Sequence, residues 1–226
     1  MVSARLILNR TLASVLFAAA VLCGLTLDGR TGQATITEQI DGPNAALSGF
    51  TGPYATVDIN RVDNNTANIV FTSLTTNGVT FLIGDGGTAD LNVNGAYTLG
   101  TVTETGLAGF TPTFKDNSPN SNVNGFGIFS LSLDNSDGYG SSANPISFLI
   151  TNSTGLWTSD AAVLVNNAGG YNAAIHAFAC NSPCMASGTA LTTGYAAKKI
   201  PEPTSLALLG TALTGLGIVA RRRRRG

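Results

Sequence analysis

One histidine and two cysteines lie close enough together in this chain to suggest chemistry. His176 is followed by Cys180 and Cys184 in the stretch HAFACNSPC, which gives a His-x3-Cys-x3-Cys spacing. Three such ligands and a water molecule can make a catalytic zinc site. Nucleophilic catalysis by a Ser-His-Asp or Cys-His set would also have to use His176, because the chain has one histidine. Its apolar neighbours favour a simpler interpretation, in which His176 is a partly buried, hydrogen-bonded strand residue.

Aspartates in glycine-rich turns and one tryptophan form the second group of candidates. The stretches DGGTAD at residues 85–90 and DNSDG at residues 134–138 place carboxylates in the flexible loops that calcium prefers. Neither has the spacing of an EF-hand or of a glycine-rich calcium repeat. No metal is therefore expected, with Asp134 and Asp137 kept as the calcium candidates. Trp157 is expected to be a core or rim aromatic rather than a platform for sugars.

The elements that must position these residues are predicted to be short strands. The middle of the chain is rich in Gly, Asn, Thr and Ser and poor in Lys, Glu and Leu, which disfavours helices. Apolar and polar residues alternate in YATVDINRV and TANIVFTSL, the period of a half-buried strand. Further strands are predicted in six stretches: GVTFLIG (78–84), DLNVNGAYTL (90–99), NGFGIFSLSL (124–133), NPISFLITN (144–152), DAAVLVNN (160–167) and NAAIHAFA (172–179).

Turn signals between these strands indicate antiparallel pairing. The pairs Asn77-Gly78, Asn94-Gly95 and Asp137-Gly138 tolerate the positive φ of hairpin turns. A short helix over GYNAAIHAFA (170–179) is the alternative for the segment that carries His176. Short strands with frequent turns predict a mainly β chain with a single antiparallel β-sandwich or jelly-roll-like domain.

The N-terminus has the layout of a secretory signal peptide. Arg5 and Arg10 precede an apolar run from Leu12 to Leu27, and the small-residue triplet Gly32-Gln33-Ala34 follows. Cleavage is expected after Ala34, with a retained signal anchor as the alternative. Export to an oxidising compartment favours a structural disulfide between the two cysteines of CNSPC over a zinc site.

The C-terminus joins an uncharged apolar stretch to a run of arginines. Thr204 to Ala220 would give roughly 25 Å of helix, just enough to cross a thin bilayer core. By the positive-inside rule, the arginines that follow would stay cytoplasmic and stop transfer. They are Arg221, Arg222, Arg223, Arg224 and Arg225.

A tripeptide directly before this stretch makes the pattern specific. Pro201, Glu202 and Pro203 form a rigid, extended entry to the apolar run. The order Pro-Glu-Pro, short glycine-rich span and terminal arginine cluster resembles the PEP-CTERM sorting signal of Gram-negative bacteria. That resemblance covers residues 201–226. It implies export, transient anchoring in the inner membrane and removal of the tail by an exosortase, a membrane-embedded processing enzyme that is the expected partner.

The segment between the two signals, residues 35–200, is acidic. It holds four basic residues (Arg61, Lys115, Lys198, Lys199) and eleven acidic ones, and four minus eleven gives a net charge of −7. This balance argues against nucleic acid as a partner. Residues 1–34 are predicted to be a signal peptide and residues 201–226 a sorting signal. Residues 35–200 are predicted to form the β-sandwich domain.

The expected function is non-enzymatic: an exported protein of the cell surface or extracellular matrix, associated with biofilm or exopolysaccharide. A second hypothesis is a lectin-like carbohydrate-binding module that uses turn aspartates, Trp157 and calcium. A third is a secreted glycan hydrolase, which needs two facing carboxylates. No acid in the sequence stands out for that role.

Overall fold

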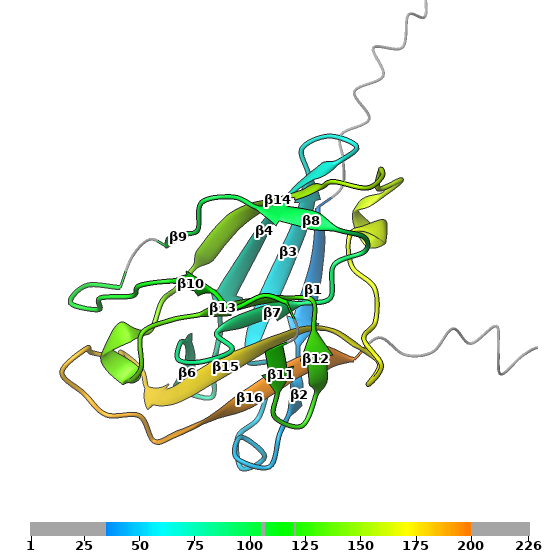
Figure 1. Cartoon of the computed structure of the whole chain (residues 1–226). Coiled ribbons are helices and arrows are strands. Elements are labelled where there is room, and N and C mark those ends of the chain that lie inside the picture. Colours follow the sequence, from blue (N-terminus) through cyan, green and yellow to red (C-terminus); the bar gives the residue numbers. More distant parts are fainter. Residues whose placement is uncertain (1–34, 105–106, 120, 200–226) are drawn as a thin grey trace, which may run out of the picture. The chain divides into compact units, whose positions relative to one another are not determined.

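The computed structural model describes residues 35–104, 107–119 and 121–199 (Figure 1). The predicted signal peptide and the predicted sorting signal lie outside these residues. The strands, in chain order, are β1 (Ile36–Ile40), β2 (Gly42–Pro43), β3 (Ala55–Arg61), β4 (Thr66–Ser73), β5 (Thr75–Thr76), β6 (Val79–Ile83), β7 (Ala89–Leu91), β8 (Tyr97–Leu99), β9 (Thr103–Glu104), β10 (Lys115–Asp116), β11 (Ser121–Val123), β12 (Gly127–Phe129), β13 (Leu131–Asp134), β14 (Ile146–Asn152), β15 (Tyr171–Asn181) and β16 (Thr192–Lys199).

These strands form two large antiparallel sheets and one small one. The six-stranded sheet has the order β1-β3-β4-β14-β8, and β9 also pairs with β14. The eight-stranded sheet has the order β10-β13-β7-β15-β16-β2, with β6 on β15 and β5 on β6. Strands β11 and β12 form a separate hairpin. A mainly β chain of antiparallel strands is therefore confirmed, whereas the finer assignment to a sandwich or jelly roll stays a prediction.

Side chains from both large sheets contribute to one hydrophobic cluster. In β3 the buried residues Ala55, Val57 and Ile59 alternate with partly exposed polar ones, as the sequence period requires. The same cluster contains Phe71 from the six-stranded sheet and Ile175 from the eight-stranded sheet. Burial of one face of each sheet in a shared core supplies the main stabilisation.

Strand β15 differs from the others because it is buried on both faces. Every residue from Asn172 to Cys180 is buried. On the face away from the main core, the β11–β12 hairpin covers one end of the strand through Phe126 and Phe129, which pack with Ala174. A second small cluster, built around Leu82, Phe110 and Cys180, covers the other end. Polar residues lie between these two apolar covers.

Several sequence predictions are wrong in detail. The stretch 160–167 holds a 3-10 turn, η2 (Asp160–Ala162), and an isolated bridge at Leu164 in place of a strand. The predicted strand at 172–179 is confirmed as part of β15, and the alternative of a short helix is wrong. Asn77-Gly78 does form a hairpin turn, with positive φ at both residues.

The other two turn pairs link different sheets. The chain passes from β7 to β8 at Asn94-Gly95, and from β13 through the 3-10 turn η1 (Tyr139–Ser141) to β14 after Asp137-Gly138. Gly95 and Gly138 do have positive φ. The dipeptides therefore mark turn geometry correctly, but turn geometry does not specify which strands pair.

Candidate functional site

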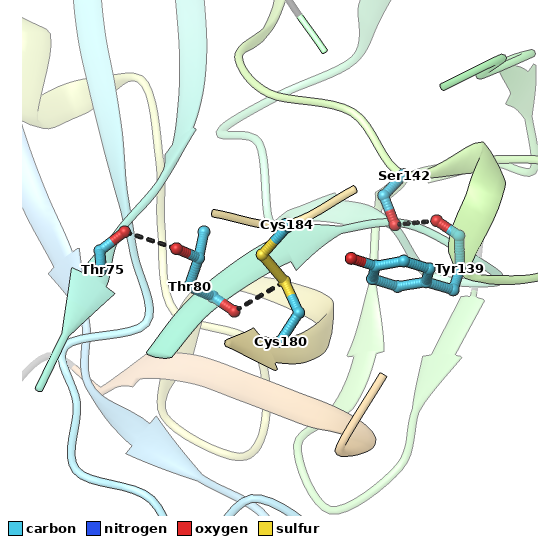
Figure 2. The surroundings of a disulfide bond; sticks show 6 residues. All are labelled: Thr75, Thr80, Tyr139, Ser142, Cys180 and Cys184. Atoms are coloured by element: carbon cyan, nitrogen blue, oxygen red, sulfur yellow. Dashed lines mark hydrogen bonds between the residues drawn. A yellow bond between two sulfur atoms is a disulfide. The ribbon is translucent and has the colours of Figure 1, made fainter. Parts of the chain in front are cut away.

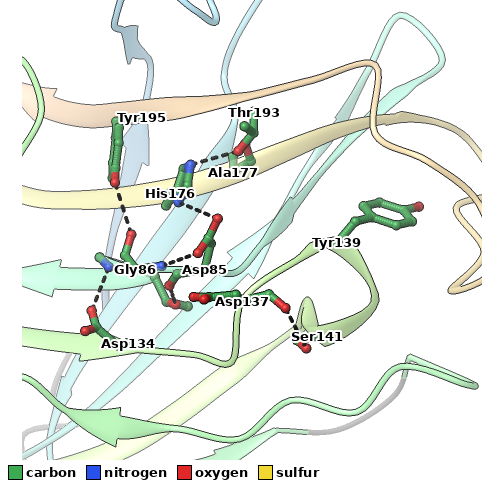
Figure 3. A network of polar contacts seen from close by, with 12 residues as sticks. Asp85, Gly86, Asp134, Asp137, Tyr139, Ser141, His176, Ala177, Thr193 and Tyr195 are labelled. Carbon is green, nitrogen blue, oxygen red and sulfur yellow. Dashed lines mark hydrogen bonds and ion pairs between the residues drawn. The ribbon is translucent and has the colours of Figure 1, made fainter.

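A cluster of ionisable side chains occupies the polar gap on the outer face of the eight-stranded sheet (Figure 3). We name it the Asp90–His176 cluster. It comprises Asp85, Asp90, Asp134, His176 and Tyr195, contributed by the β6–β7 turn and by β7, β13, β15 and β16. These strands are neighbours in the sheet, so residues far apart in sequence meet on one face.

Asp90 is the most unusual member of the cluster. Its side chain is fully buried, and neither carboxyl oxygen has a hydrogen-bond partner among the described residues. Burial raises the pKa of Asp90 to about 8, and the neighbouring charge of Asp134 acts in the same direction. The Ser132 hydroxyl, opposite Asp90 in the β7–β13 register, opposes that rise without reaching hydrogen-bond distance. The carboxyl group is therefore mostly protonated at neutral pH.

His176 lies one strand away from Asp90 and is also buried. Its Nε2 is 2.7 Å from the hydroxyl oxygen of Thr193. Its Nδ1 is 3.9 Å from Oδ2 of Asp85, close enough for an ion pair but too far for a hydrogen bond. Desolvation by burial lowers the pKa of His176, and the Asp85 carboxylate opposes that effect. The expectation of a partly buried, hydrogen-bonded strand histidine is confirmed.

Tyr195 and the turn before β7 close over the cluster. The Tyr195 ring stacks on the His176 ring with centroids 4.2 Å apart, and its hydroxyl donates to the Gly86 carbonyl oxygen at 3.2 Å. The Gly87 amide donates to Oδ1 of Asp134 at 2.8 Å. The turn is thus fastened at Gly86 and at Gly87, which keeps water away from the buried carboxyl group.

A hydroxyl, an imidazole and a carboxylate lie in series here, as in a hydrolase triad. The order is Thr193, His176, Asp85. The 3.9 Å separation at Nδ1 breaks the hydrogen-bonded relay that such a triad uses. The Thr193 hydroxyl is also within 3.2 Å of the Ala177 carbonyl oxygen, a partner that competes with His176 for its proton. The geometry of these described atoms suits a structural histidine.

The metal candidates of the sequence do not come together. In the described part of the chain, no three His, Cys, Asp or Glu side chains are placed to hold a metal ion. Asp134 already accepts the Gly87 amide, and Asp137 is exposed on the following turn. The expectation of no metal stays a prediction, and Asp134 and Asp137 stay candidates for calcium only.

Cys180 and Cys184 form a disulfide, with Cα atoms 5.8 Å apart (Figure 2). Cys180 is the last buried residue of β15, and its sulfur lies 3.4 Å from the Thr80 carbonyl oxygen of β6. The five-residue loop therefore closes at the end of the central strand. Both thiols are used in this bond, so the zinc alternative for His176, Cys180 and Cys184 is not the arrangement found.

Trp157 is a core residue, as expected. It is 1% exposed, and its indole nitrogen donates to the Asn94 carbonyl oxygen at 2.8 Å. The Trp157 carbonyl oxygen accepts from Arg61, whose guanidinium nitrogen Nε lies 3.5 Å from Oδ1 of Asp160. A buried indole offers no face to a sugar, so the lectin hypothesis loses its aromatic platform.

Sequence reasoning missed Asp90 as a member of a cluster. The stretch DGGTAD was interpreted as one acidic turn, although Asp90 lies between Ala89 and Leu91, two residues with the burial of a core strand. That apolar flanking is the signal for a strand aspartate. The sequence did not predict that the outer face of the eight-stranded sheet is covered near Asp90. The β11–β12 hairpin that contributes to this cover begins about 30 residues after Asp90.

The C-terminal end of the described domain adjoins the second functional feature of the chain. Strand β16 ends at Lys199, and the Pro-Glu-Pro tripeptide begins at residue 201. A family model described as the PEP-CTERM protein-sorting motif matches residues 199–225. No curated protein and no solved structure matches the chain. Within the described residues no helix is long and apolar enough to span a membrane, and the predicted span lies outside them.

Proposed function

We infer that this chain, which carries the PEP-CTERM sorting motif at residues 199–225, is exported, held transiently in a membrane and processed by an exosortase. From this premise we propose that its mature form is a non-enzymatic component of the cell surface or extracellular matrix of a Gram-negative bacterium. The observation that carries the proposal is the motif at residues 199–225, placed directly after the last strand of a β domain. We further propose that this domain is a β-sandwich.

The net charge and the disulfide of residues 35–200 support a location outside the cytoplasm. Residues 35–200 have a net charge of −7 and one disulfide, which suit a soluble domain in an oxidising compartment. In the Asp90–His176 cluster, Asp90 and His176 are buried, whereas Asp85 is partly exposed. The two buried residues serve packing in this proposal, and the protein acts through its surface.

The outer face of the six-stranded sheet is the surface best suited to matrix contact. Its side chains alternate with core residues along each strand, and neighbouring strands place them in cross-strand rows. Nine of the twelve are neutral hydroxyl or amide groups, which match a neutral polysaccharide better than a charged polymer. They are Thr37, Gln39, Thr56, Asp58, Asn60, Thr66, Asn68, Val70, Thr72, Ser147, Leu149 and Thr151.

This face is also where the carbohydrate-binding hypothesis would have to act. Asp58 is the one charged member of the set, and its carboxylate already accepts the Thr37 hydroxyl. Leu149 is 44% exposed on the same face. Because its two new carboxylates disrupt this face, an Asn68→Asp/Leu149→Glu variant should be released from the extracellular matrix by washing. The natural protein should stay bound under the same washing conditions. Equal retention of both proteins would remove this face from the proposal.

The experiment that tests the sorting function is a change of the motif's acid. Glu202→Ala in the full chain should leave most of the protein unprocessed and membrane-bound, measured by fractionation and gel mobility in the native host. Glu104→Ala, distant from the motif in sequence, is the control and should be processed normally. Normal processing of Glu202→Ala would make the tripeptide incidental and overturn the proposal.

A further inference from the structure

The last strand of the domain ends one residue before the tripeptide that the sorting enzyme reads. β16 ends at Lys199, Ile200 follows, and the Pro-Glu-Pro begins at Pro201. Three residues of extended chain reach about 10 Å. A membrane-embedded enzyme that recognises the tripeptide therefore has to approach to within about 10 Å of the paired end of β16.

Pairing along β16 is strong up to Ala197 and weak beyond it. Ala196 and Ala197 are fully buried and are paired on both sides, with β15 and with the two residues of β2. The last two residues of β16 are paired on one side only, with β15. The register on β15 also shifts between Tyr171 and Ala173, which face these last two residues. A strand pairs least firmly where it lacks one neighbour and the ladder is irregular.

Release of this end would cost the domain little. Peeling Lys198 and Lys199 from β15 breaks pairing at the irregular end and leaves the two-sided pairing of Ala196 and Ala197 intact. Peeling further would expose both buried alanines and separate β16 from Gly42 and Pro43. The structure therefore has a natural stopping point at Ala197.

We propose that Lys198 and Lys199 are a releasable spacer: the end of β16 detaches from β15 as far as Ala197 when the exosortase engages the tripeptide. Detachment extends the reach from the folded sheet to Glu202 from about 10 Å to about 17 Å. Tail removal then proceeds on a folded domain, and the strand end can pair again after cleavage. This inference rests on the proposed sorting function.

The test cross-links the end of β16 to β15 and then lengthens the chain between Lys199 and the tripeptide. Tyr171→Cys/Lys199→Cys places a thiol pair across the last register position of β15 and β16. Formation of the cross-link is verified by thiol labelling of the protein. Conversion of the full chain to the processed form is then followed by pulse-chase in the native host. The locked variant should be processed at least several-fold more slowly than the natural protein, and a reductant should remove the delay.

A second variant separates a lost spacer from a misfolded domain. The same cysteine pair with Gly-Ser-Gly-Ser inserted after Lys199 regains the reach while the strand end stays locked, so its processing should return to the natural rate. The same insertion between Ser187 and Gly188, in an exposed loop, should not rescue the locked variant. Natural-rate processing of the locked variant, or failure of the insertion after Lys199 to rescue it, would overturn the spacer. If the natural protein itself is not processed, the sorting function fails instead.

Discussion

Gly87 lies directly against the buried carboxyl group of Asp90: a Cβ atom placed on Gly87 would meet Oδ2 of Asp90 at 3.2 Å. The same atom would meet the Tyr195 ring at 3.3 Å, and the φ of Gly87 is +67°. Both space and backbone conformation therefore require glycine at this position. The turn can cover Asp90 closely only because residue 87 has no side chain.

Asp90 should make the domain less stable as the pH rises. Its pKa is 3.8 when unperturbed and about 8 in the folded domain, so between these values the folded state binds more protons than the unfolded state. The contribution of Asp90 to the free energy of unfolding is fully present below about pH 4. It decreases between about pH 4 and about pH 8, by at most about 1.4 kcal/mol per pH unit. Asp90→Asn cannot ionise and should flatten this slope. Urea unfolding of both proteins from about pH 5 to about pH 8 measures it; parallel slopes would show that Asp90 is not protonated.

Gly194→Ala should destabilise the domain. A Cβ at residue 194 would come within 2.8 Å of the Asn44 side-chain oxygen and 3.0 Å of Leu47 Cγ. Because Leu47 is fully buried, relief of this clash has to move the core, at a cost of about 1–3 kcal/mol. Gly155→Ala is the matched control, since nothing lies within 4 Å of its Cβ. Equal urea midpoints for the two variants would contradict the close contact of Gly194 with Asn44 and Leu47.

Loss of Asp160 should be among the most damaging single changes. Its Oδ1 accepts the Arg61 amide at 2.8 Å and lies 3.5 Å from the Arg61 guanidinium, with both side chains nearly buried. Asp160→Ala removes one carboxylate from a nearly buried guanidinium and the acceptor of the Arg61 amide, and breaking a buried pair typically costs about 3–5 kcal/mol. Asp137→Asn, on an exposed turn, is the control. Calorimetry should show a large drop in melting temperature for the first variant alone, and a small drop would mean that the ion pair is dispensable.

The disulfide should contribute modestly to stability. Closing a loop of five residues, Cys180 to Cys184, is worth about 2 kcal/mol in the chain-entropy account. The Cys180→Ala/Cys184→Ala variant should therefore stay folded with a free energy of unfolding lower by about 2 kcal/mol. Chemical denaturation measures the difference. Free thiols in the protein recovered from cells would instead show that the bond does not form there.

Local features of the fold were predictable from sequence where residue type and conformation are tightly linked. The alternation in β3 and β4 and the Asn77-Gly78 turn required only near neighbours in the chain. The pairing of the two cysteines of CNSPC was also predictable, because they are near neighbours in the chain. The apolar stretch at residues 160–167 does not form the predicted strand, because Val163 and Leu164 reach the core from the end of a 3-10 turn and from an isolated bridge.

The candidate site depends on long-range packing and was therefore harder to predict. Asp90 and His176 are 86 positions apart in the chain and share a face only through the strand order β7-β15-β16. A single sequence does not specify that order. The sorting tail is the opposite case, because the parts of its motif are contiguous in the sequence.

The most direct test of the central claim is the intact mass of the protein recovered from the native cell surface or medium. The account predicts a chain that begins near Thr35 and ends close to the Pro-Glu-Pro at residues 201–203, together with any group attached there. A mass that still includes Arg221 to Arg225 would contradict it, because the tail would then be a permanent anchor.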